Sequence, residues 1–251
     1  MAATTANQAR AAEILKSMEG DVSMVSERLS EWWSNYLTYH HDRYLGTLDF
    51  LESVKSRVLE IGSVPCQFTS LLQQLGYEVR GMDLAPERVE AFIRKHELSV
   101  DKVDIETDPF PFEDGSFGMV IFLEVLEHLR INPLHTFREL ARVLEPGGRL
   151  LLSTPNITPA HRLMFFFDKP YQGDLVAEFR KLETVGHMGH FRLYSLVDIR
   201  AMLDEVGLEV VATSFEGEYA TPTWKTKWMR ILSPRKDIFR TYTYVQARKR
   251  S

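Results

Sequence analysis

The stretch VLEIGSVPCQFTSLL, residues 58–72, decides the fold. Residues 57–61 have the β-rich composition of a short strand, and a helical pattern begins after the turn, at Gln67. A strand that passes through a glycine turn into a helix is the first half of a strand–helix–strand unit. In open α/β sheets the ligand lies beyond the carboxyl ends of the strands, so the turn at Gly62 is the first candidate binding site.

The same rhythm continues along the chain. Further strands are expected at 78–82, near 100–103, at 119–122 and at 149–153, with helices at 67–75, 86–95 and 133–144 between them. A helix from Ser195 through Glu205 and strands at 208–215 and 241–247 follow. We therefore expect an α/β, doubly wound, Rossmann-like fold with a seven-stranded, mostly parallel sheet whose last strand is antiparallel.

The pattern also suggests how the chain is organised around that sheet. We expect an N-terminal helical cap (1–55), a cofactor-binding core (56–156), a cap insertion after the fifth strand (157–194) and the end of the sheet (195–251), all in one structural domain. Apolar residues recur at helical spacing in the first segment, whereas prolines and glycines break the rhythm in the third.

Bulk properties narrow the class of protein. The net charge of −5 argues against nucleic acid as a partner, although a local basic patch would not show in that number. The single cysteine, Cys66, fits a reducing compartment, and the first twenty residues lack the apolar core of a signal peptide. Without a segment of membrane-spanning length, we expect a cytoplasmic protein, and the oligomeric state stays open.

Three cofactor classes use a glycine turn of this kind. A phosphate-binding P-loop is excluded because no Gly-Lys-Ser/Thr sequence follows the turn, and a dinucleotide fingerprint fails because Val64 and Gln67 occupy its later glycine positions. S-adenosylmethionine has no phosphate, and its ribose diol suits a carboxylate at the end of the second strand, where Asp83 stands. The alternative is that Asp83 only caps the helix at Pro86.

Four stretches in order resemble the motifs of class I S-adenosylmethionine-dependent methyltransferases, especially the type 11 or ubiquinone-pathway O-methyltransferase group. They cover about residues 56–156 and read VLEIGSVPCQFTSLL (58–72), GYEVRGMDLAPERV (76–89), VDIETDPFPFEDGSFGMVIFLEVLEHL (103–129) and FRELARVLEPGGRLLLSTPN (137–156). The chain departs from the family's G-x-G-x-G turn at Val64 and Cys66, and Gly118 replaces an aspartate that the family usually carries.

The resemblance implies roles for individual residues. Glu60, Gly62 and Ser63 would surround the methionine part of the cofactor, Asp83 would hold the ribose, and Leu84 would pack on the adenine. Asp104 and Ile105 would lie at the adenine edge, and Leu123 and Glu124 beneath the sulfonium. From the segment YHHDRY (39–44), Tyr39 and Arg43 would complete the site, with Arg43 paired to the cofactor carboxylate; the alternative is an ordinary solvated helix face.

Candidate residues for the chemistry cluster in two places. If a helix begins at Glu124, then Glu124, Glu127 and His128 share one face, and the segment HMGHFRLY (187–194) supplies His190. Two carboxylates and one or two imidazoles are a plausible Mg²⁺ or Mn²⁺ set, and this pairing resembles the metal-dependent 2′-O-methyltransferases of small RNAs. Without a metal, His128 or His190 is the best general base.

Three functions follow. The leading one is O-methylation of a small-molecule or glycan acceptor. The second is metal-dependent methylation of an RNA 2′-hydroxyl, which the acidic net charge disfavours. The third is a non-catalytic module that binds the cofactor or a protein.

Overall fold

The computed structural model describes residues 2–51, 54, 56–157, 176, 179–180, 189–219, 228, 231, 233 and 237–250. The chain divides into two compact units. The first unit contains Met1–Ile121 and Val143–Gly148, and the second contains Phe122–Arg142 and Arg149–Ser251. The four segments expected from the sequence stay predictions, and most of the predicted cap insertion lies outside the described residues.

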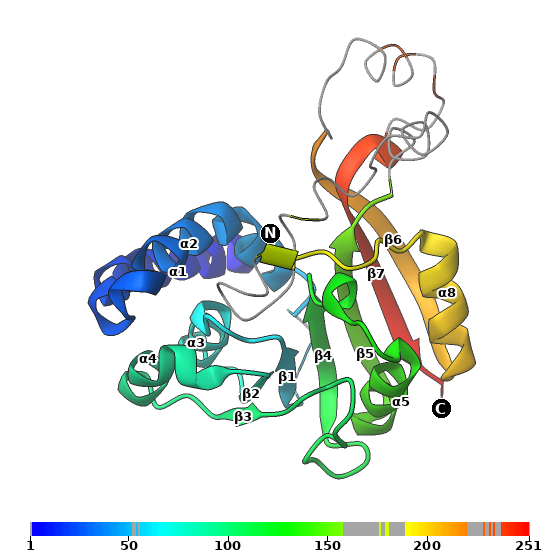
Figure 1. Cartoon of the computed structure of the whole chain (residues 1–251), viewed down its shortest axis with the longest axis horizontal. Coiled ribbons are helices and arrows are strands. Elements are labelled where there is room, and N and C mark those ends of the chain that lie inside the picture. Colours follow the sequence, from blue (N-terminus) through cyan, green and yellow to red (C-terminus); the bar gives the residue numbers. More distant parts are fainter. Residues whose placement is uncertain are drawn as a thin grey trace. The chain divides into compact units, whose positions relative to one another are not determined.

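The first unit begins with the expected helices. Helix α1 (Ala2–Ser17) is followed by the 3-10 helix η1 (Met18–Met24), and α2 (Glu27–Leu48) returns alongside α1 (Figure 1). Helices α1 and α2 and the 3-10 helix η1 bury apolar side chains at helical spacing; these are Ala11, Leu15, Met18, Trp33 and Leu37. None of the helices among the described residues is long and apolar enough to cross a membrane.

Seven strands form one sheet in the order β3-β2-β1-β4-β5-β7-β6. They are β1 (Val58–Ile61), β2 (Val79–Asp83), β3 (Val100–Lys102), β4 (Phe117–Leu123), β5 (Leu144–Pro155), β6 (Leu208–Tyr219) and β7 (Arg240–Lys249). Strand β1 pairs in parallel with β2, whereas β7 runs antiparallel to both β5 and β6. The prediction of a seven-stranded sheet with an antiparallel last strand is confirmed.

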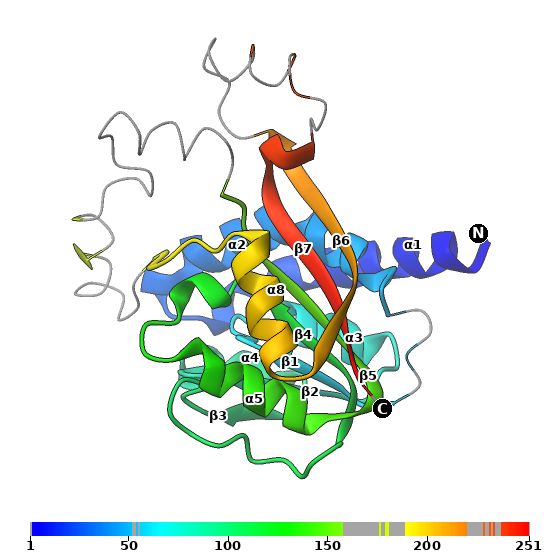
Figure 2. The ribbon, with the colours of Figure 1, turned by 90° about the vertical axis from the view of Figure 1, so that its right-hand side faces the viewer.

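Burial explains why the central strands are largely apolar. All four residues of β1 and the first six of β4 are buried, as expected where helices cover both faces of a parallel sheet. The connecting helices are α3 (Gln67–Gln74), η2 (Pro86–Val89), α4 (Glu90–Lys95), η3 (Leu126–His128), α5 (Pro133–Val143), α8 (Leu196–Glu205) and η4 (Asp237–Phe239). In the second unit, α8 packs along β6 (Figure 2).

Helix α8 has the start that its sequence predicts. The Ser195 hydroxyl accepts a hydrogen bond from the backbone N–H of Asp198, and the Asp198 carboxylate accepts one from the backbone N–H of Ser195. This reciprocal pair is a capping box, which satisfies two amide groups that would otherwise lack a partner. After the helix, Gly207 adopts a positive φ of 76°, which favours glycine and lets the chain turn into β6.

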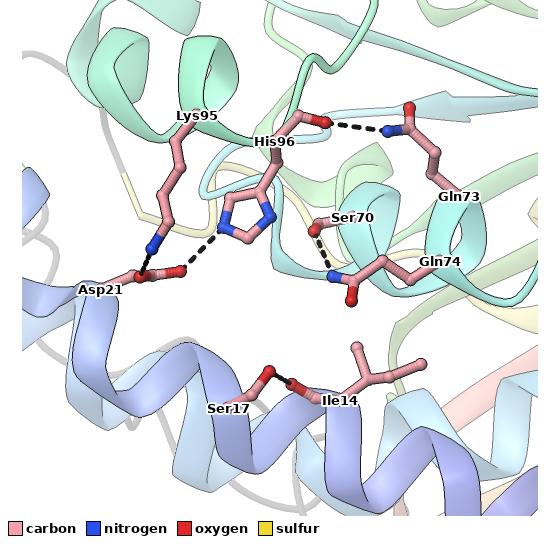
Figure 3. Close-up of polar contacts among 8 residues, drawn as sticks. All are labelled: Ile14, Ser17, Asp21, Ser70, Gln73, Gln74, Lys95 and His96. Carbon is pink, nitrogen blue, oxygen red and sulfur yellow. Dashed lines mark hydrogen bonds and ion pairs between the residues drawn. The ribbon is translucent and has the colours of Figure 1, made fainter.

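A buried polar cluster ties the N-terminal helices to α4 within the first unit. Asp21 of η1 is 4% exposed, and its carboxylate accepts hydrogen bonds from Lys95 and from His96 Nε2, the latter at 2.8 Å. Figure 3 shows both side chains pointing to Asp21, while the backbone carbonyl of His96 accepts from Gln73 of α3. A buried carboxylate needs such partners, because an unpaired charge is costly to remove from water.

Candidate active site

The turn after β1 is tied to the end of β2 in the first unit. Gly62 has a φ of 71°, and the backbone N–H groups of Gly62 and Ser63 both donate to the carbonyl of Met82, at 2.8 and 3.0 Å. A residue with a side chain rarely adopts this φ, so glycine is required where the chain turns. The carboxyl end of β1 therefore carries a tight turn with fixed backbone, as the sequence predicts.

Gly81 on β2 makes room for that turn, and sequence reasoning missed it. A Cβ atom at position 81 would lie 2.8 Å from Ser63 Oγ and 3.2 Å from a methyl group of Val100. Such contacts are closer than side chains tolerate, so a larger residue would push Ser63 out of place. Because Gly81 sits in a strand interior, where glycine is unfavourable, the glycine itself was the available signal.

The two departures from the family turn behave differently. Cys66 is fully buried with a φ of 65°, a conformation that glycine adopts readily and cysteine rarely, so the backbone keeps the shape for which the family uses glycine. Burial also raises the pKa of its thiol well above the ordinary value. Val64, by contrast, keeps an ordinary φ and donates its backbone N–H to Asp83 at 3.0 Å.

Asp83 is fixed by backbone groups on both oxygens. Its Oδ2 accepts from the N–H of Val64, and its Oδ1 accepts from the N–H of Ala85 at 2.9 Å. Burial raises the pKa of Asp83, although these two hydrogen bonds act in the opposite direction. The N-cap residue of η2 is Ala85, and no side chain caps this helix. Asp83 therefore does not act as its helix cap, which was the alternative.

Glu60 of β1 lies buried beside this turn. It is 8% exposed, and its Oε2 accepts a hydrogen bond of 2.5 Å from Thr69 Oγ1 of α3. Burial raises the pKa of Glu60 to about 8, against the opposing effects of the Thr69 hydrogen bond and the charge of Arg43. The positive charge that lowers the pKa of Glu60 comes from Arg43 of α2.

The two predicted cofactor residues of the segment YHHDRY on α2, Tyr39 and Arg43, differ in their surroundings. The Arg43 guanidinium lies 6.0 Å from the ring centroid of Tyr44, and Tyr44 stacks on Phe68 of α3 with ring centroids 5.0 Å apart. These contacts bring Arg43 toward the turn after β1. Tyr39 is 79% exposed and makes no hydrogen bond or ring contact with another described residue, so its predicted part in cofactor binding gains no support from its position.

The predicted adenine edge lies at the carboxyl ends of β2 and β3. Leu84 is 50% exposed, which leaves its side chain available to a ligand. The N–H of Val103 donates to the carbonyl of Asp83 at 3.0 Å, and this bond brings the residues that follow β3 next to those that follow β2. Asp104 and Ile105 are half-buried there, and Asp104 Oδ1 accepts from the N–H of Glu106. Leu84, Asp104 and Ile105 therefore lie near Asp83, at the carboxyl ends of β2 and β3.

Leu123 is the last residue of β4, Glu124 follows it, and both belong to the second unit. The expectation that a helix begins at Glu124 is wrong, because Glu124 has a φ of 57° and the following 3-10 helix contains only Leu126–His128. Its N–H still bonds to the carbonyl of Ser153 in the sheet, and its Oε1 accepts from Ser153 Oγ at 2.6 Å. Glu124 therefore does not share a helix face with Glu127 and His128.

Three of the four predicted metal ligands nevertheless come together in the second unit. Each of Glu127, His128 and His190 offers one ligand atom, and these atoms lie within 4.8 Å of one another. The Glu127 side chain is fully buried and accepts from Thr154 Oγ1 at 3.0 Å, whereas His190 is about half exposed. Glu124, the fourth predicted ligand, is not in this group, and His187 lies outside the described residues.

Backbone contacts fix the geometry of this cluster. The carbonyl of Glu127 accepts from the N–H groups of Phe191 and Arg192, which holds the chain after His190 against η3. His128 Nδ1 lies 2.9 Å from the carbonyl of Gly189. A carbonyl can only accept, so Nδ1 carries the proton and Nε2 keeps its lone pair for a metal ion or a proton.

Thr243 of β7 is a further polar residue that sequence reasoning missed. In the β5–β7 register it pairs directly with Thr154, the threonine that donates to Glu127. Thr243 is 1% exposed, and its hydroxyl has no hydrogen-bond partner among the described residues. Directly paired residues lie on the same face of a sheet, so the Thr243 hydroxyl lies on the face that carries the Thr154–Glu127 contact.

The strand order and the antiparallel last strand define the Rossmann-like methyltransferase fold. A family model described as a methyltransferase domain matches residues 36–213. Because the match spans more than half of the sequence, this chain belongs to the methyltransferase domain family.

Curated relatives match part of the chain. A ubiquinone biosynthesis O-methyltransferase of Xanthomonas oryzae pv. oryzae is 39% identical over 115 residues, which are 44% of this chain and 47% of that protein. The protein of the same name from Xanthomonas campestris pv. campestris is 40% identical over 110 residues, 42% of this chain and 45% of that protein. The chain thus spans about half the length of the curated relatives it matches.

Solved structures share the fold over most of the chain. A SAM-dependent methyltransferase from Archaeoglobus fulgidus has a TM-score of 0.59 at 16% identity and covers 83% of this chain and 92% of that one. An S-adenosylmethionine-dependent methyltransferase from Mesorhizobium loti has a TM-score of 0.55 at 18% identity, with coverage of 82% and 97%. At such low identity these likenesses establish the fold alone.

Proposed function

We propose that the chain transfers a methyl group from S-adenosylmethionine to an oxygen of a small-molecule acceptor. The observation that carries this proposal is the arrangement of Gly62, Asp83 and Asp104 at the carboxyl ends of three neighbouring strands, in a chain of the methyltransferase domain family. The curated relatives are named as O-methyltransferases, which favours an oxygen acceptor. Those relatives lend no support to the RNA or non-catalytic alternatives.

The residues of the first unit fit the cofactor by their chemistry. Asp83 is held rigid by two backbone amides and retains lone pairs for a vicinal diol, and the exposed face of Leu84 suits a planar base. Arg43 would pair with the cofactor carboxylate, near the turn at Gly62 and Ser63. The bound cofactor supplies an activated methyl group on a positively charged sulfur, so the chain mainly binds and orients the reactants.

The cluster of the second unit is the proposed acceptor end. His128 Nε2 keeps its lone pair because Nδ1 donates to Gly189, so His128 would take the proton from the acceptor hydroxyl. His190 is the second candidate base, since its ring lies 5.5 Å from that of His128. The buried carboxylate of Glu127 would stabilise positive charge on either imidazole. Its Oε1 lies 4.0 Å from Nε2 of His190.

The convergence of Glu127, His128 and His190 also favours a metal-assisted variant. One carboxylate and two imidazoles are suitable ligands for Mn²⁺, and less so for Mg²⁺, which prefers oxygen. A divalent cation held there would lower the pKa of an acceptor hydroxyl, while Thr154 keeps the Glu127 carboxylate in place.

Calorimetry and product analysis test the proposal together. S-adenosylmethionine is titrated into the whole chain, and methyl transfer to a panel of phenols, catechols and sugars is followed with Mg²⁺, with Mn²⁺ and with chelator. Saturable cofactor binding and an oxygen-methylated product are expected. A chain that binds no cofactor contradicts the enzyme function, and equal activity in chelator and in Mn²⁺ contradicts only the metal-assisted variant.

A further inference from the structure

Thr243 of β7 carries a buried hydroxyl group that no described residue satisfies. The residue is 1% exposed, and its Oγ1 makes no hydrogen bond with any part of the chain that the structure describes. A hydroxyl group in this position has given up its hydrogen bonds to water without replacement, which destabilises the fold. Valine has almost the same shape and would not carry this cost, so packing alone does not explain a threonine here.

Strand pairing places Thr243 one residue away from the Glu127 carboxylate. Thr243 pairs directly with Thr154 of β5, which lies beside β7 (Figure 2), and the Cβ atoms of such a pair are about 4.5–5.5 Å apart on one face of the sheet. The Thr154 hydroxyl in turn donates to Glu127 Oε2 at 3.0 Å. On its other side Thr243 pairs with Phe215 of β6, whose side chain has no hydrogen-bonding atom. The polar surroundings of the Thr243 hydroxyl therefore lie on the side of Glu127.

The same carboxylate belongs to the cluster of candidate metal ligands. One ligand atom from each of Glu127, His128 and His190 lies within 4.8 Å of the other two, and Glu127 Oε1 is 4.0 Å from His190 Nε2. The Glu127 side chain is fully buried, so a cation held there would compensate a charge that is costly to remove from water. Mn²⁺ is commonly octahedral, and three side chains leave the rest of its ligands to water or to the acceptor.

We propose that Thr243 is a positioning residue of this cluster, and that its hydroxyl group hydrogen-bonds a water molecule on a divalent cation held by Glu127, His128 and His190. The inference rests on the metal-assisted variant of the proposed function. The protons of such a water point away from the cation, so the Thr243 oxygen accepts one of them. Polar groups that stand behind the direct ligands of a metal contribute strongly to its affinity.

The two paired threonines should then respond differently to loss of the hydroxyl group. Thr154 bonds to the buried Glu127 carboxylate, so Thr154→Val should weaken both the fold and the binding of the cation. Thr243→Val removes a hydroxyl group that has no partner among the described residues, so the fold should be no less stable, whereas cation binding should weaken. A threonine with a purely structural role would not give this combination.

Calorimetry and urea denaturation of the whole chain measure the two effects separately. Mn²⁺ alone is titrated into the unmodified chain, Thr243→Val and Thr243→Ser, and the urea midpoint of each is measured in chelator. We expect Thr243→Val to bind Mn²⁺ about 10- to 100-fold more weakly, the usual effect of removing a group behind a metal ligand, with an unchanged or higher urea midpoint. Thr243→Ser keeps the hydroxyl group and should bind Mn²⁺ as the unmodified chain does.

Thr213→Val is the matched control. Thr213 is a half-buried residue of β6 that pairs with Val245 of β7, so the same substitution there should leave the affinity for Mn²⁺ unchanged. Equal affinity in Thr243→Val and the unmodified chain overturns the inference while leaving the metal site in place. A lower urea midpoint of Thr243→Val in chelator also overturns it, because the hydroxyl group would then serve the fold. An unmodified chain that binds no Mn²⁺ contradicts the metal-assisted variant itself, and the inference with it.

Discussion

Asp83 is oriented before any ligand arrives, because the backbone N–H groups of Val64 and Ala85 each hold one of its oxygens. Hydrogen bonds from a ligand to a charged, preorganised group are among the stronger ones. We expect Asp83→Ala to weaken binding of S-adenosylmethionine roughly 10- to 100-fold, measured by calorimetry. Asp42→Ala, at a fully exposed carboxylate of α2, is the control and should bind as the unmodified chain does. Unchanged affinity in Asp83→Ala would refute the ribose assignment.

His128 offers a test of the acceptor end that leaves the cofactor site alone. Because Nδ1 is committed to Gly189, the proposed role needs the Nε2 lone pair, which alanine lacks. We expect His128→Ala to lower kcat by about 10²- to 10⁴-fold, the usual contribution of a general base, with cofactor affinity unchanged. His135→Ala, at a histidine of α5 outside the cluster, is the control and should retain activity. Retained kcat in His128→Ala rules out its role as base or ligand.

Individual residues differ in how far the sequence could place them. Gly62 and Asp83 were predictable because Gly62 follows β1 directly and Asp83 is the last residue of β2, and parallel strands bring those positions to one edge. Glu124 was misplaced because the sequence does not reveal that its backbone adopts a positive φ. Thr243 was missed because its place opposite Thr154 depends on a pairing between strands about 90 residues apart in sequence.

The start of α8 was predictable because a capping box is a local pattern within four residues. We expect Ser195→Ala to lower the free energy of unfolding by about 1 kcal/mol, measured by urea denaturation. The double variant Ser195→Ala, Asp198→Ala serves as the control for cooperation between the two side chains. Its effect should be smaller than the sum of the single effects, since each removes the same reciprocal pair. If the effects of the two single variants on the free energy of unfolding add exactly, the two hydrogen bonds of the capping box do not reinforce each other.

The contact between η1 and α4 could not be predicted, because Asp21 meets Lys95 and His96 across more than seventy residues of sequence. Burial acts to raise the pKa of Asp21, but the hydrogen bonds from Lys95 and His96 outweigh it, so the pKa lies below its ordinary value. The resulting stabilisation is present above pH 3.8 and is lost as the pH falls through the lowered pKa.

Asp21→Asn tests this contact. The variant removes the charge that pairs with Lys95 and His96, so we expect the free energy that protects α1 and η1 from opening to fall by about 2 kcal/mol. Amide hydrogen exchange measures it helix by helix. Asp42→Asn, at an exposed carboxylate of the adjacent α2, should leave exchange unchanged. Equal exchange in the two variants would show that the buried cluster does not hold the N-terminal helices.

At the scale of the whole molecule, the alternation of strands and helices was enough to predict the sheet, because few topologies satisfy right-handed crossovers. The lengths of the last strands were not predictable. Strands β5 and β6 are each 12 residues long, well beyond the expected 149–153 and 208–215. Antiparallel pairing with β7 reaches Pro155 in β5 and Tyr219 in β6, beyond the expected strand ends, and such pairing depends on partners that a local pattern does not contain.

Glu60 links the stability of the fold to pH. Its pKa is about 8 in the folded chain against an ordinary 4.5, so between these values the folded state holds a proton that the unfolded state has lost. Stability should therefore fall as pH rises through this range, by at most about 1.4 kcal/mol per pH unit. Glu60→Gln has no such proton, so its free energy of unfolding should rise relative to that of the unmodified chain.

Urea denaturation of the two proteins at matched pH values measures that difference, because the contributions of all other groups cancel to a first approximation. The free energy of unfolding of the variant should exceed that of the unmodified chain least near pH 5 and most near pH 8, because the buried carboxyl group of the unmodified chain begins to ionise near pH 8. Saturating S-adenosylmethionine should shrink the gain near pH 8, since the proposed site supplies the positive charge that the carboxylate lacks. Parallel stability profiles from pH 5 to pH 8 would mean that Glu60 is already ionised in the folded chain.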